Sequence, residues 1–381
     1  MLAVWKTNGR CRLSFHCGTI CPFSRLSANL KGLRLGVKSG LSPILRRSVM
    51  NLEPIGPETA LEMYLTDRET EVAQATLYSH RSRLSHFVRW CAEKEVENLN
   101  QLTGRMLHQY RLWRRNESDI TVVTEKTQID TLRVLIRWLE SIDAVEPDLH
   151  TKVLSPTLSP GDNVRTEMLE TERAEQILSY FGKYEYASRP HVVISLMWHT
   201  MMRVGAIHSL DLEDYSSDGR YLEVVHRPET GTPIKNAEDG ERHVALSEST
   251  CDLLDGWIED RRPNVTDDTG RKPQVSTSQG RAHITTLRGD CYRCTRPCVY
   301  TGECLHDRSI PDCNAAEYGS ESECPSSVSP HALRRGGITH HLNNSVPKDV
   351  VSDRANVSKD VFDTHYDQRN EQNKMEQRRN I

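Results

Sequence analysis

Apolar residues recur at helical spacing between about residue 57 and residue 145 and predict four helices. These helices are predicted at 60–67, 75–94, 103–116 and 124–142. The last has the clearest apolar face, formed by Ile129, Leu132, Leu135, Ile136 and Leu139. A stripe of this kind is buried against neighbouring helices. We therefore expect residues 50–145 to form an all-α domain.

A polar segment with several prolines follows, and we interpret residues 146–164 as a linker. Beyond it, the pattern changes to helices mixed with two short strands. The helices are predicted at 166–181, 190–202 and 249–261, the strands at 221–225 and 242–246, and further helices begin at Pro330 and near Ser358. We expect residues 165–381 to form a mostly α domain with a small antiparallel sheet and a cysteine-rich insertion at 291–324.

No apolar stretch approaches the roughly 18–20 residues that a membrane-spanning helix needs. The most apolar helical run, 189–202, is short and interrupted by histidines, which favours a buried helix. Hydrophobic residues make up 36% of the chain and charged residues 27%, as is typical of globular proteins. We expect no membrane association and a cytoplasmic location.

Residues 1–49 differ in composition from the rest of the chain. They hold nine Lys and Arg and no Asp or Glu, and they show neither helical nor strand periodicity. They also lack the continuous apolar core of a signal peptide. We expect a basic disordered arm, which could grip DNA, or an extension that results from a start upstream of Met50.

The rest of the chain is acidic. Residues 50–381 hold the remaining 40 Lys and Arg against 53 Asp and Glu, a net charge of −13. Contacts with phosphate dominate nucleic-acid binding, so this balance indicates either a protein that does not bind DNA or one that works at high salt, as halophilic proteins do. The motifs described below favour the second interpretation.

One stretch restores positive charge locally. Apart from three glutamates at 93–97, residues 72–116 contain no acid. A positive surface of this kind is what a DNA-facing helix needs, although a solvated helical face is the simpler alternative. The candidate DNA-binding residues are Arg81, Arg83, Arg89, Arg111, Arg114 and Arg115.

A second candidate site lies at the predicted helix start at Pro330. Ser329 suits the N-cap position and Pro330 the first helical position. His331 and Arg334 are then three residues apart on the first turn, where free N–H groups and the helix dipole attract anions. Taken alone, the stretch could equally be an ordinary capped surface helix.

Four places in chain order suit a single reaction, the transfer of a phosphoryl group from DNA to a side-chain oxygen. They are Arg203, Lys235, the pair His331 and Arg334, and Tyr366. Permanently charged arginines can clamp the extra negative charge of a pentavalent phosphorus transition state. A histidine can take a proton, a lysine can give one to the leaving oxygen, and a tyrosine can attack.

Around these residues the sequence resembles the tyrosine recombinase, or phage integrase, family, particularly its members from salt-loving archaea. The segments 199–214, 233–246, 329–342 and 351–367 match the family's first arginine box, its lysine hairpin, its His-x-x-Arg box and its terminal tyrosine box. The resemblance implies that Arg203, Lys235, His331 and Arg334 are catalytic and that Tyr366 is the nucleophile.

The resemblance also implies the fold and the activity. The fold would be an all-α, SAM-like core-binding domain followed by a catalytic domain of the DNA breaking-rejoining type. The activity would be site-specific recombination through a 3′-phosphotyrosine, for integration, excision or resolution, with no cofactor for catalysis. The partners would be double-stranded DNA and three further copies of the chain, in a homo-tetramer on paired DNA sites. The alternatives are relaxation of DNA, as by a type IB topoisomerase, and a catalytically weak DNA-binding accessory protein.

Two positions depart from the family pattern. Many members have a glutamate three residues after the first arginine, where this chain has Ala206. Many have a Gly-His pair before the tyrosine, where this chain has Ala355 and Asn356. Asn356 is included among the catalytic candidates because its amide can bond a phosphate oxygen, although it cannot carry a proton or a charge.

Six of the eleven cysteines gather in the insertion, and Cys291 and Cys294 have a spacing that zinc sites use. Without a secretion signal, such a cluster is more typical of metal binding than of disulfides, and free thiols are the alternative. The resemblance to archaeal members favours a structural zinc on Cys298, Cys304, Cys313 and Cys324. Cys291, Cys294 and His306 are alternates.

Overall fold

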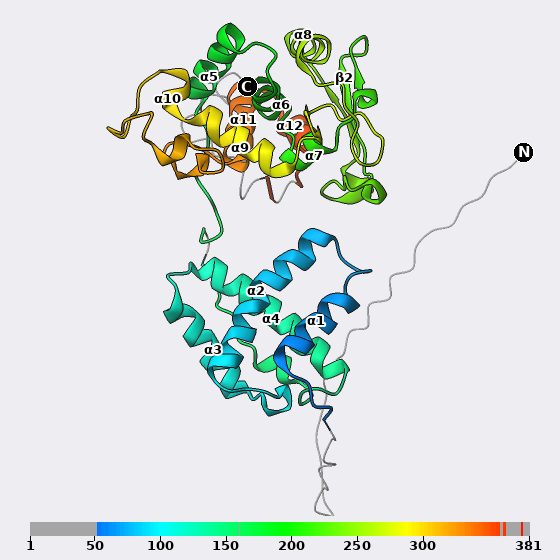
Figure 1. The fold of residues 1–381 in the computed structure, drawn as a ribbon, viewed down its shortest axis with the longest axis vertical. Helices are drawn as coiled ribbons and strands as arrows, with labels where there is room; N and C mark the ends of the chain where they lie inside the picture. Colours follow the sequence, from blue (N-terminus) through cyan, green and yellow to red (C-terminus); the bar gives the residue numbers. More distant parts are fainter. Residues whose placement is uncertain (1–51, 160, 359–360, 363–374, 376–381) are drawn as a thin grey trace, which may run out of the picture. The chain divides into compact units, whose positions relative to one another are not determined.

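The computed structural model describes residues 52–159, 161–358, 361–362 and 375 (Figure 1). The arm expected at 1–49 and the candidate nucleophile Tyr366 lie outside the described residues. The chain divides into two compact units, which we describe separately. Within the described residues, the first contains 52–107 and 132–152, and the second contains 108–131 and the residues from 153 onward.

Four helices make up the first part of the chain, as the periodicity predicts. They are α1 Pro57–Asp67, α2 Gln74–Glu93, α3 Gly104–Glu117 and α4 Val122–Ser141, with short 3-10 turns at Leu99–Gln101 and Leu149–Lys152. Each boundary lies within three residues of the predicted one. Pro57 occupies the start of α1, where its missing N–H leaves no hydrogen bond unmade.

Aromatic side chains form the core of the first unit. Phe87 and Trp90 of α2 are each 1% exposed, and their rings stack. Tyr64 of α1 meets Trp138 of α4 edge to face at 5.6 Å. Its hydroxyl also lies 2.9 Å from Nδ1 of His80. Burying each large apolar side chain of this kind stabilises the fold by about 1.5–3 kcal/mol.

The boundary at residue 152 falls inside the linker predicted for 146–164. The grouping of 108–131 with the later residues has no signal in the sequence, because it depends on long-range contacts. One of these is a hydrogen bond from the Ser155 hydroxyl to a carboxylate oxygen of Asp130.

The second unit is mostly helical with small antiparallel sheets, as expected. Its α-helices beyond the linker are α5 Thr171–Tyr184, α6 Arg189–Thr200, α7 Val204–Ser209, α8 Glu248–Gly256, α9 Ile284–Thr295, α10 Pro297–Tyr300, α11 Pro330–Asn343 and α12 Lys348–Ala355. The helix expected at 249–261 ends early as α8 and continues as a π-helical turn at Trp257–Arg261. The helix expected near Ser358 lies largely outside the described residues.

The predicted strand pair is present. β2 Tyr221–Val224 pairs antiparallel with β3 Arg242–Ala245, and Leu222 stands opposite Val244. The short strand β1 Tyr215–Ser216 adds to the other edge of β2. A separate two-stranded ribbon is formed by β4 Ser276–Thr277 and β5 Gly280–Arg281.

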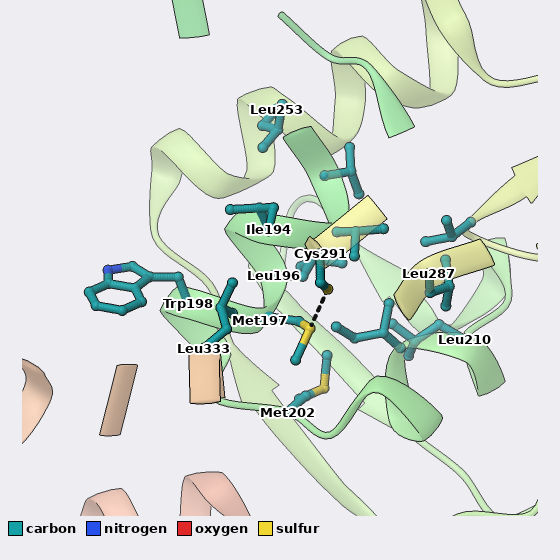
Figure 2. Close-up of a cluster of buried hydrophobic side chains, with 14 of the residues drawn as sticks. Ile194, Leu196, Met197, Trp198, Met202, Leu210, Leu253, Leu287, Cys291 and Leu333 are labelled. Atoms are coloured by element: carbon teal, nitrogen blue, oxygen red, sulfur yellow. Dashed lines mark hydrogen bonds between the residues drawn. The ribbon is translucent and has the colours of Figure 1, made fainter. Parts of the chain in front are cut away.

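Helix α6 is the centre of the second unit. Ten of its twelve residues are buried, which confirms the expectation of a buried helix at this place. Figure 2 shows Ile194, Leu196 and Met197 of α6 among side chains from α8, α9 and α11. The thiol of Cys291 on α9 lies 3.4 Å from the sulfur of Met197.

Two glycines allow α11 to approach α6 closely. A Cβ atom on Gly336 would stand 2.1 Å from the carbonyl oxygen of Leu169, and one on Gly337 would stand 2.7 Å from that of Trp198. A larger residue at 337 would push α11 away from the backbone of α6, and one at 336 would push it away from the segment that leads into α5. This close packing fixes the start of α11 beside the end of α6.

Four of the described helices were not predicted. α7, α10 and α12 have six, four and eight residues, too few for a periodic pattern to be recognised. α9 begins before the insertion expected at 291–324 and ends inside it, and α10 lies wholly inside it. None of the helices in the described part of the chain is long and apolar enough to cross a bilayer.

Candidate active site

A pocket of about 200 Å³ lies where the ends of α6, α11 and α12 meet the β2–β3 connection. Five of the six residues predicted to be catalytic line it: Arg203, Lys235, His331, Arg334 and Asn356. The sixth, Tyr366, lies outside the described residues. Ala206, one of the two departures from the family pattern, also lines the pocket.

Arg203 is positioned by a sharp break between α6 and α7. Met201 ends α6 in the left-handed conformation, with φ of 56°, and Arg203 is the N-cap residue of α7. Its guanidinium is half-buried and donates a hydrogen bond of 2.9 Å to the carbonyl oxygen of Asn356. The break therefore turns the first arginine toward the end of α12.

His331 and Arg334 occupy the first turn of α11, as predicted. The Ser329 hydroxyl caps this helix by accepting a hydrogen bond from the N–H of Ala332. Arg334 is 1% exposed. Its guanidinium donates to the carbonyl oxygens of Met201 and Ala355. A charge so deeply buried is tolerated only with such partners.

His331 lines the pocket and keeps an exposed surface. Partial burial lowers the pKa of His331 to about 4, and the positive charges of Arg334 and Arg203 act in the same direction. At neutral pH its ring is therefore uncharged and able to accept a proton. Arg335 also favours the neutral ring, but its own side chain bonds to the carbonyl oxygen of Glu167, and it does not line the pocket.

Lys235 projects from the connection between β2 and β3, and its side chain is exposed. The residue that follows it, Asn236, has φ of 75° and donates from its side chain to Oδ1 of Asn356, at 3.2 Å. A left-handed conformation suits asparagine. The lysine turn is thus tied to the end of α12.

Asn356 is the C-cap of α12 and has φ of 49°. Its backbone carbonyl accepts from Arg203 and its side chain accepts from Asn236. An asparagine fits this position for conformational reasons, independent of any proton transfer. Asn356 lines the pocket, and its catalytic role stays a prediction.

Arg242, on β3, lines the same pocket and was not singled out in the sequence. It donates to the carbonyl oxygens of Gly240, at 2.8 Å, and Arg354, at 3.2 Å. Burial lowers its pKa to about 10, and the charges of Arg203 and Arg354 act in the same direction. The signal that could have found it is a positive charge on the strand directly after the lysine turn.

Three of the six arginines predicted to bind DNA have acidic partners from other helices. Arg81 of α2 pairs with Glu62 of α1 through both of its terminal nitrogens. Arg111 and Arg115 of α3 both pair with Glu125 of α4. Acidic residues of a neighbouring helix therefore neutralise these three arginines, although residues 72–116 themselves hold few acids.

The other three arginines differ in exposure. Arg114 is 5% exposed and donates to Ser118 and Glu117. Arg89 is exposed and Arg83 partly so. The exposed pairs, such as Arg81 with Glu62, are weak in water and can be replaced by phosphate contacts.

The four favoured cysteines gather at one place. Together with His306, they line a small enclosed pocket of about 20 Å³ between residues 296 and 324; they are Cys298, Cys304, Cys313 and Cys324. None is in a disulfide. Among the described residues, no three His, Cys, Asp or Glu side chains are already arranged as metal ligands.

The alternates Cys291 and Cys294 lie elsewhere. Both are fully buried on α9, and burial raises the pKa of each thiol. Their CxxC spacing therefore reflects a helical face in the core, and neither lines the pocket of the other four.

The comparisons with known proteins give both sequence and fold relatives. The chain matches no family model and no curated protein. It is 36% identical to the N-terminal domain of a phage integrase/site-specific recombinase from Haloarcula marismortui, over 27% of this chain and 99% of that one, with a TM-score of 0.27.

Two solved structures match most of the chain. A λ integrase dimer bound to a COC′ core site has a TM-score of 0.55 and 15% identity, over 83% of this chain and 78% of that one. The Tn1549 transposon integrase in complex with a circular intermediate DNA has a TM-score of 0.58 and 13% identity, over 84% of this chain and 99% of that one.

The mainly helical architecture with small antiparallel sheets is that of the λ-integrase-like catalytic fold. The chain belongs to the tyrosine recombinase, or phage integrase, family. This confirms the family resemblance on which the sequence interpretation rests.

Proposed function

We propose that this protein is a site-specific DNA recombinase that cuts and rejoins DNA through a 3′-phosphotyrosine at Tyr366. One observation carries the proposal. Arg203, Lys235, His331 and Arg334 come from separated segments of the chain and line a single pocket. Two guanidinium groups, an ammonium group and a neutral imidazole around one cavity suit the negative charge of a phosphodiester.

Each side chain has a role in the proposed cleavage step. The guanidinium groups of Arg203 and Arg334 bind the non-bridging oxygens of the scissile phosphate. The Tyr366 hydroxyl attacks phosphorus and its proton passes to the neutral ring of His331. The bond from phosphorus to the 5′-oxygen breaks, and Lys235 protonates that oxygen. Rejoining is the reverse, so no cofactor is required for the chemistry.

The proposal is tested by trapping the covalent intermediate on a nicked suicide substrate that carries the recombination site. The wild-type protein is expected to become attached to DNA at Tyr366, through a link that survives acid. Tyr366→Phe removes only the attacking oxygen, so attachment is lost while DNA binding remains. Arg203→Ala is expected to slow attachment about 100–1000-fold.

An adduct that persists in Tyr366→Phe, or none in the wild type on its own site, contradicts the proposal. The other two candidate functions give different results in the same assay. Relaxation of supercoiled DNA without strand exchange identifies a topoisomerase, and binding without covalent capture identifies an accessory protein.

The proposed partners are double-stranded DNA and three further copies of this chain. The λ and Tn1549 integrases have been solved on DNA, and one λ integrase structure is a tetramer on a Holliday junction. For this chain, the helices with Arg81, Arg83, Arg89, Arg111, Arg114 and Arg115 are the proposed DNA-facing elements.

We also propose a structural zinc ion on Cys298, Cys304, Cys313 and Cys324. Their shared pocket has room for about one small ion. The thiols must move inward to reach the roughly 2.3 Å that zinc–sulfur bonds require. Between residues 301 and 329 the structure has only 3-10 turns. A bound metal would therefore stabilise a segment with little regular structure of its own.

Elemental analysis of the purified protein tests the zinc proposal. About one zinc per chain is expected, and a chelator should lower the unfolding temperature as it removes the metal. Cys304→Ser is expected to lose the zinc, whereas Cys251→Ser, at a buried cysteine of α8, should keep it. Protein without stoichiometric metal, or equal zinc content in both variants, excludes the site.

A further inference from the structure

The turn that carries Lys235 is held in place by contacts at both of its ends. At the near end, the Asn236 side chain donates to Oδ1 of Asn356. At the far end, Arg242 donates to the carbonyl oxygens of Gly240 and Arg354. Both contacts join the β2–β3 connection to the last residues of α12.

Gly240 transmits the far contact to Lys235. A Cβ atom on Gly240 would stand 2.4 Å from the carbonyl oxygen of Lys235, so the two backbones lie in direct contact. Gly240 is buried, whereas the Lys235 side chain is exposed. When Arg242 fixes the carbonyl of Gly240, it therefore also fixes the backbone from which the Lys235 side chain extends.

We propose that Arg242 is a positioning residue, which holds the Lys235 turn against the end of α12 so that the ammonium group reaches the departing 5′-oxygen. This inference rests on the proposed recombinase function. Arg242 acts through Lys235: it fixes the general acid in place, and its own charge is not the essential property.

The chemistry of the side chain supports an arginine at this position. Its planar guanidinium presents separate N–H groups in fixed directions, and here Nε and Nη1 bond two carbonyls on different elements. A lysine has a single nitrogen on a flexible stem and cannot reproduce this bridge. Arg242→Lys therefore keeps the positive charge of the pocket and removes the fixed geometry.

The test compares two leaving groups in single-turnover cleavage of the suicide substrate. With the natural 5′-oxygen, Arg242→Lys is expected to cleave about 10–100-fold more slowly than the wild type, because a misplaced catalytic group is costly. Its affinity for DNA should stay within about twofold. With sulfur in place of the bridging 5′-oxygen, the thiolate leaves without a proton, and the variant should regain the wild-type rate.

Reference variants show whether a cleavage rate restored by the sulfur substrate indicates a defect in protonation of the leaving group. Lys235→Ala is expected to be rescued by the sulfur substrate in the same way, whereas Arg203→Ala should remain slow. Asn236→Gly removes the other tie at an exposed residue whose left-handed conformation glycine tolerates, and it should show a smaller defect that sulfur also rescues.

Arg262→Lys is the matched control. Arg262 is also partly buried and bonds only to backbone carbonyls, those of Pro263, Val265 and Pro273, away from the pocket. Its replacement should lower stability and leave both cleavage rates unchanged.

The outcomes distinguish a failure of the proposed function from a failure of the role proposed for Arg242. If the wild type forms no covalent adduct, the proposed function fails and the inference fails with it. If the wild type reacts but Arg242→Lys is equally fast on the oxygen substrate, or equally slow on both substrates, Arg242 does not act through Lys235 and the inference is overturned.

Discussion

At the scale of single residues, full or partial burial lowers the pKa of several histidines in the second unit. His331 of the candidate site is one example, because its pKa of about 4 leaves a neutral ring at pH 7. A bound phosphate would bring negative charge to the same place and raise that pKa. His191 of α6 is the structural example. It is 6% exposed, packs against the rings of Phe181 and Tyr186, and burial lowers its pKa to about 4.

His191 is expected to make the fold sensitive to acid. Its pKa is lower in the folded state than the ordinary 6.5, so the unfolded state binds the proton more readily. The stability it contributes is present above pH 6.5 and is lost as the pH falls toward 4. Between pH 7.5 and 4.5, the wild type should lose about 2–3 kcal/mol more unfolding free energy than His191→Phe. Urea unfolding at the two pH values measures this, and equal losses would contradict it.

At the scale of elements, the contact between α11 and α6 decides where the site forms. α11 carries His331 and Arg334, and α6 ends at Thr200, three residues before Arg203. Gly337 sets how closely α11 approaches the backbone of α6, and Gly336 sets how closely it approaches that of Leu169. The geometry of the pocket thus depends on residues that do not touch the substrate.

Gly336→Ala is expected to destabilise the protein by roughly 3 kcal/mol or more, because the new methyl group collides with a backbone carbonyl. The unfolding temperature should fall by several degrees. Gly182→Ala in α5 is the control, since nothing lies within 4 Å of a Cβ atom there. That variant should gain about 0.5–1 kcal/mol. Thermal unfolding of the two variants should therefore shift in opposite directions.

At the scale of the whole molecule, charge sets the conditions under which the protein works. Residues 50–381 carry a net charge of −13, and some of their arginines are already paired. Buried ion pairs, such as Asp211 with Arg271 and Arg281, are screened little by salt. Repulsion between exposed acids is screened strongly, so salt should favour the folded state.

The unfolding temperature is therefore expected to rise between about 0.1 M and 2 M potassium chloride, and specific DNA binding should persist at molar salt. Ordinary phosphate-driven binding weakens by orders of magnitude over that range. Calorimetry and a binding titration at both salt concentrations check this. A protein that unfolds at high salt, or binds best near 0.1 M, would show that the acidic surface has another cause.

Periodicity was sufficient to predict the long helices and the β2–β3 pair, because each has a repeating pattern set by its own residues. The start of α11 was predictable from Ser329 and Pro330, which cap it locally. The pocket's residues were predictable only as a set, since each of them has an ordinary structural explanation when taken alone.

The rest depends on contacts that are distant in sequence. Glu125 neutralises Arg111 and Arg115 from another helix, which a count of charges along α3 does not show. Arg242 is recognisable only when β3 is seen beside α12. Cys291 and Cys294 have the spacing of zinc ligands, yet the same spacing places them on the buried face of α9.

The last turn of α12 offers three successive carbonyl groups, at residues 354, 355 and 356, to three arginines of the pocket: Arg242, Arg334 and Arg203. Fixing each of these long side chains costs up to about 2 kcal/mol of conformational free energy, and this cost falls on folding of the protein. In the proposed reaction, neither cutting nor rejoining then has to order them again. Because the arginines are equally ready for a phosphodiester and for a phosphotyrosine, the site gives no preference to either direction. An enzyme built in this way is expected to shuttle between cut and joined DNA with an equilibrium constant near one, and the direction of recombination must be imposed from outside the pocket.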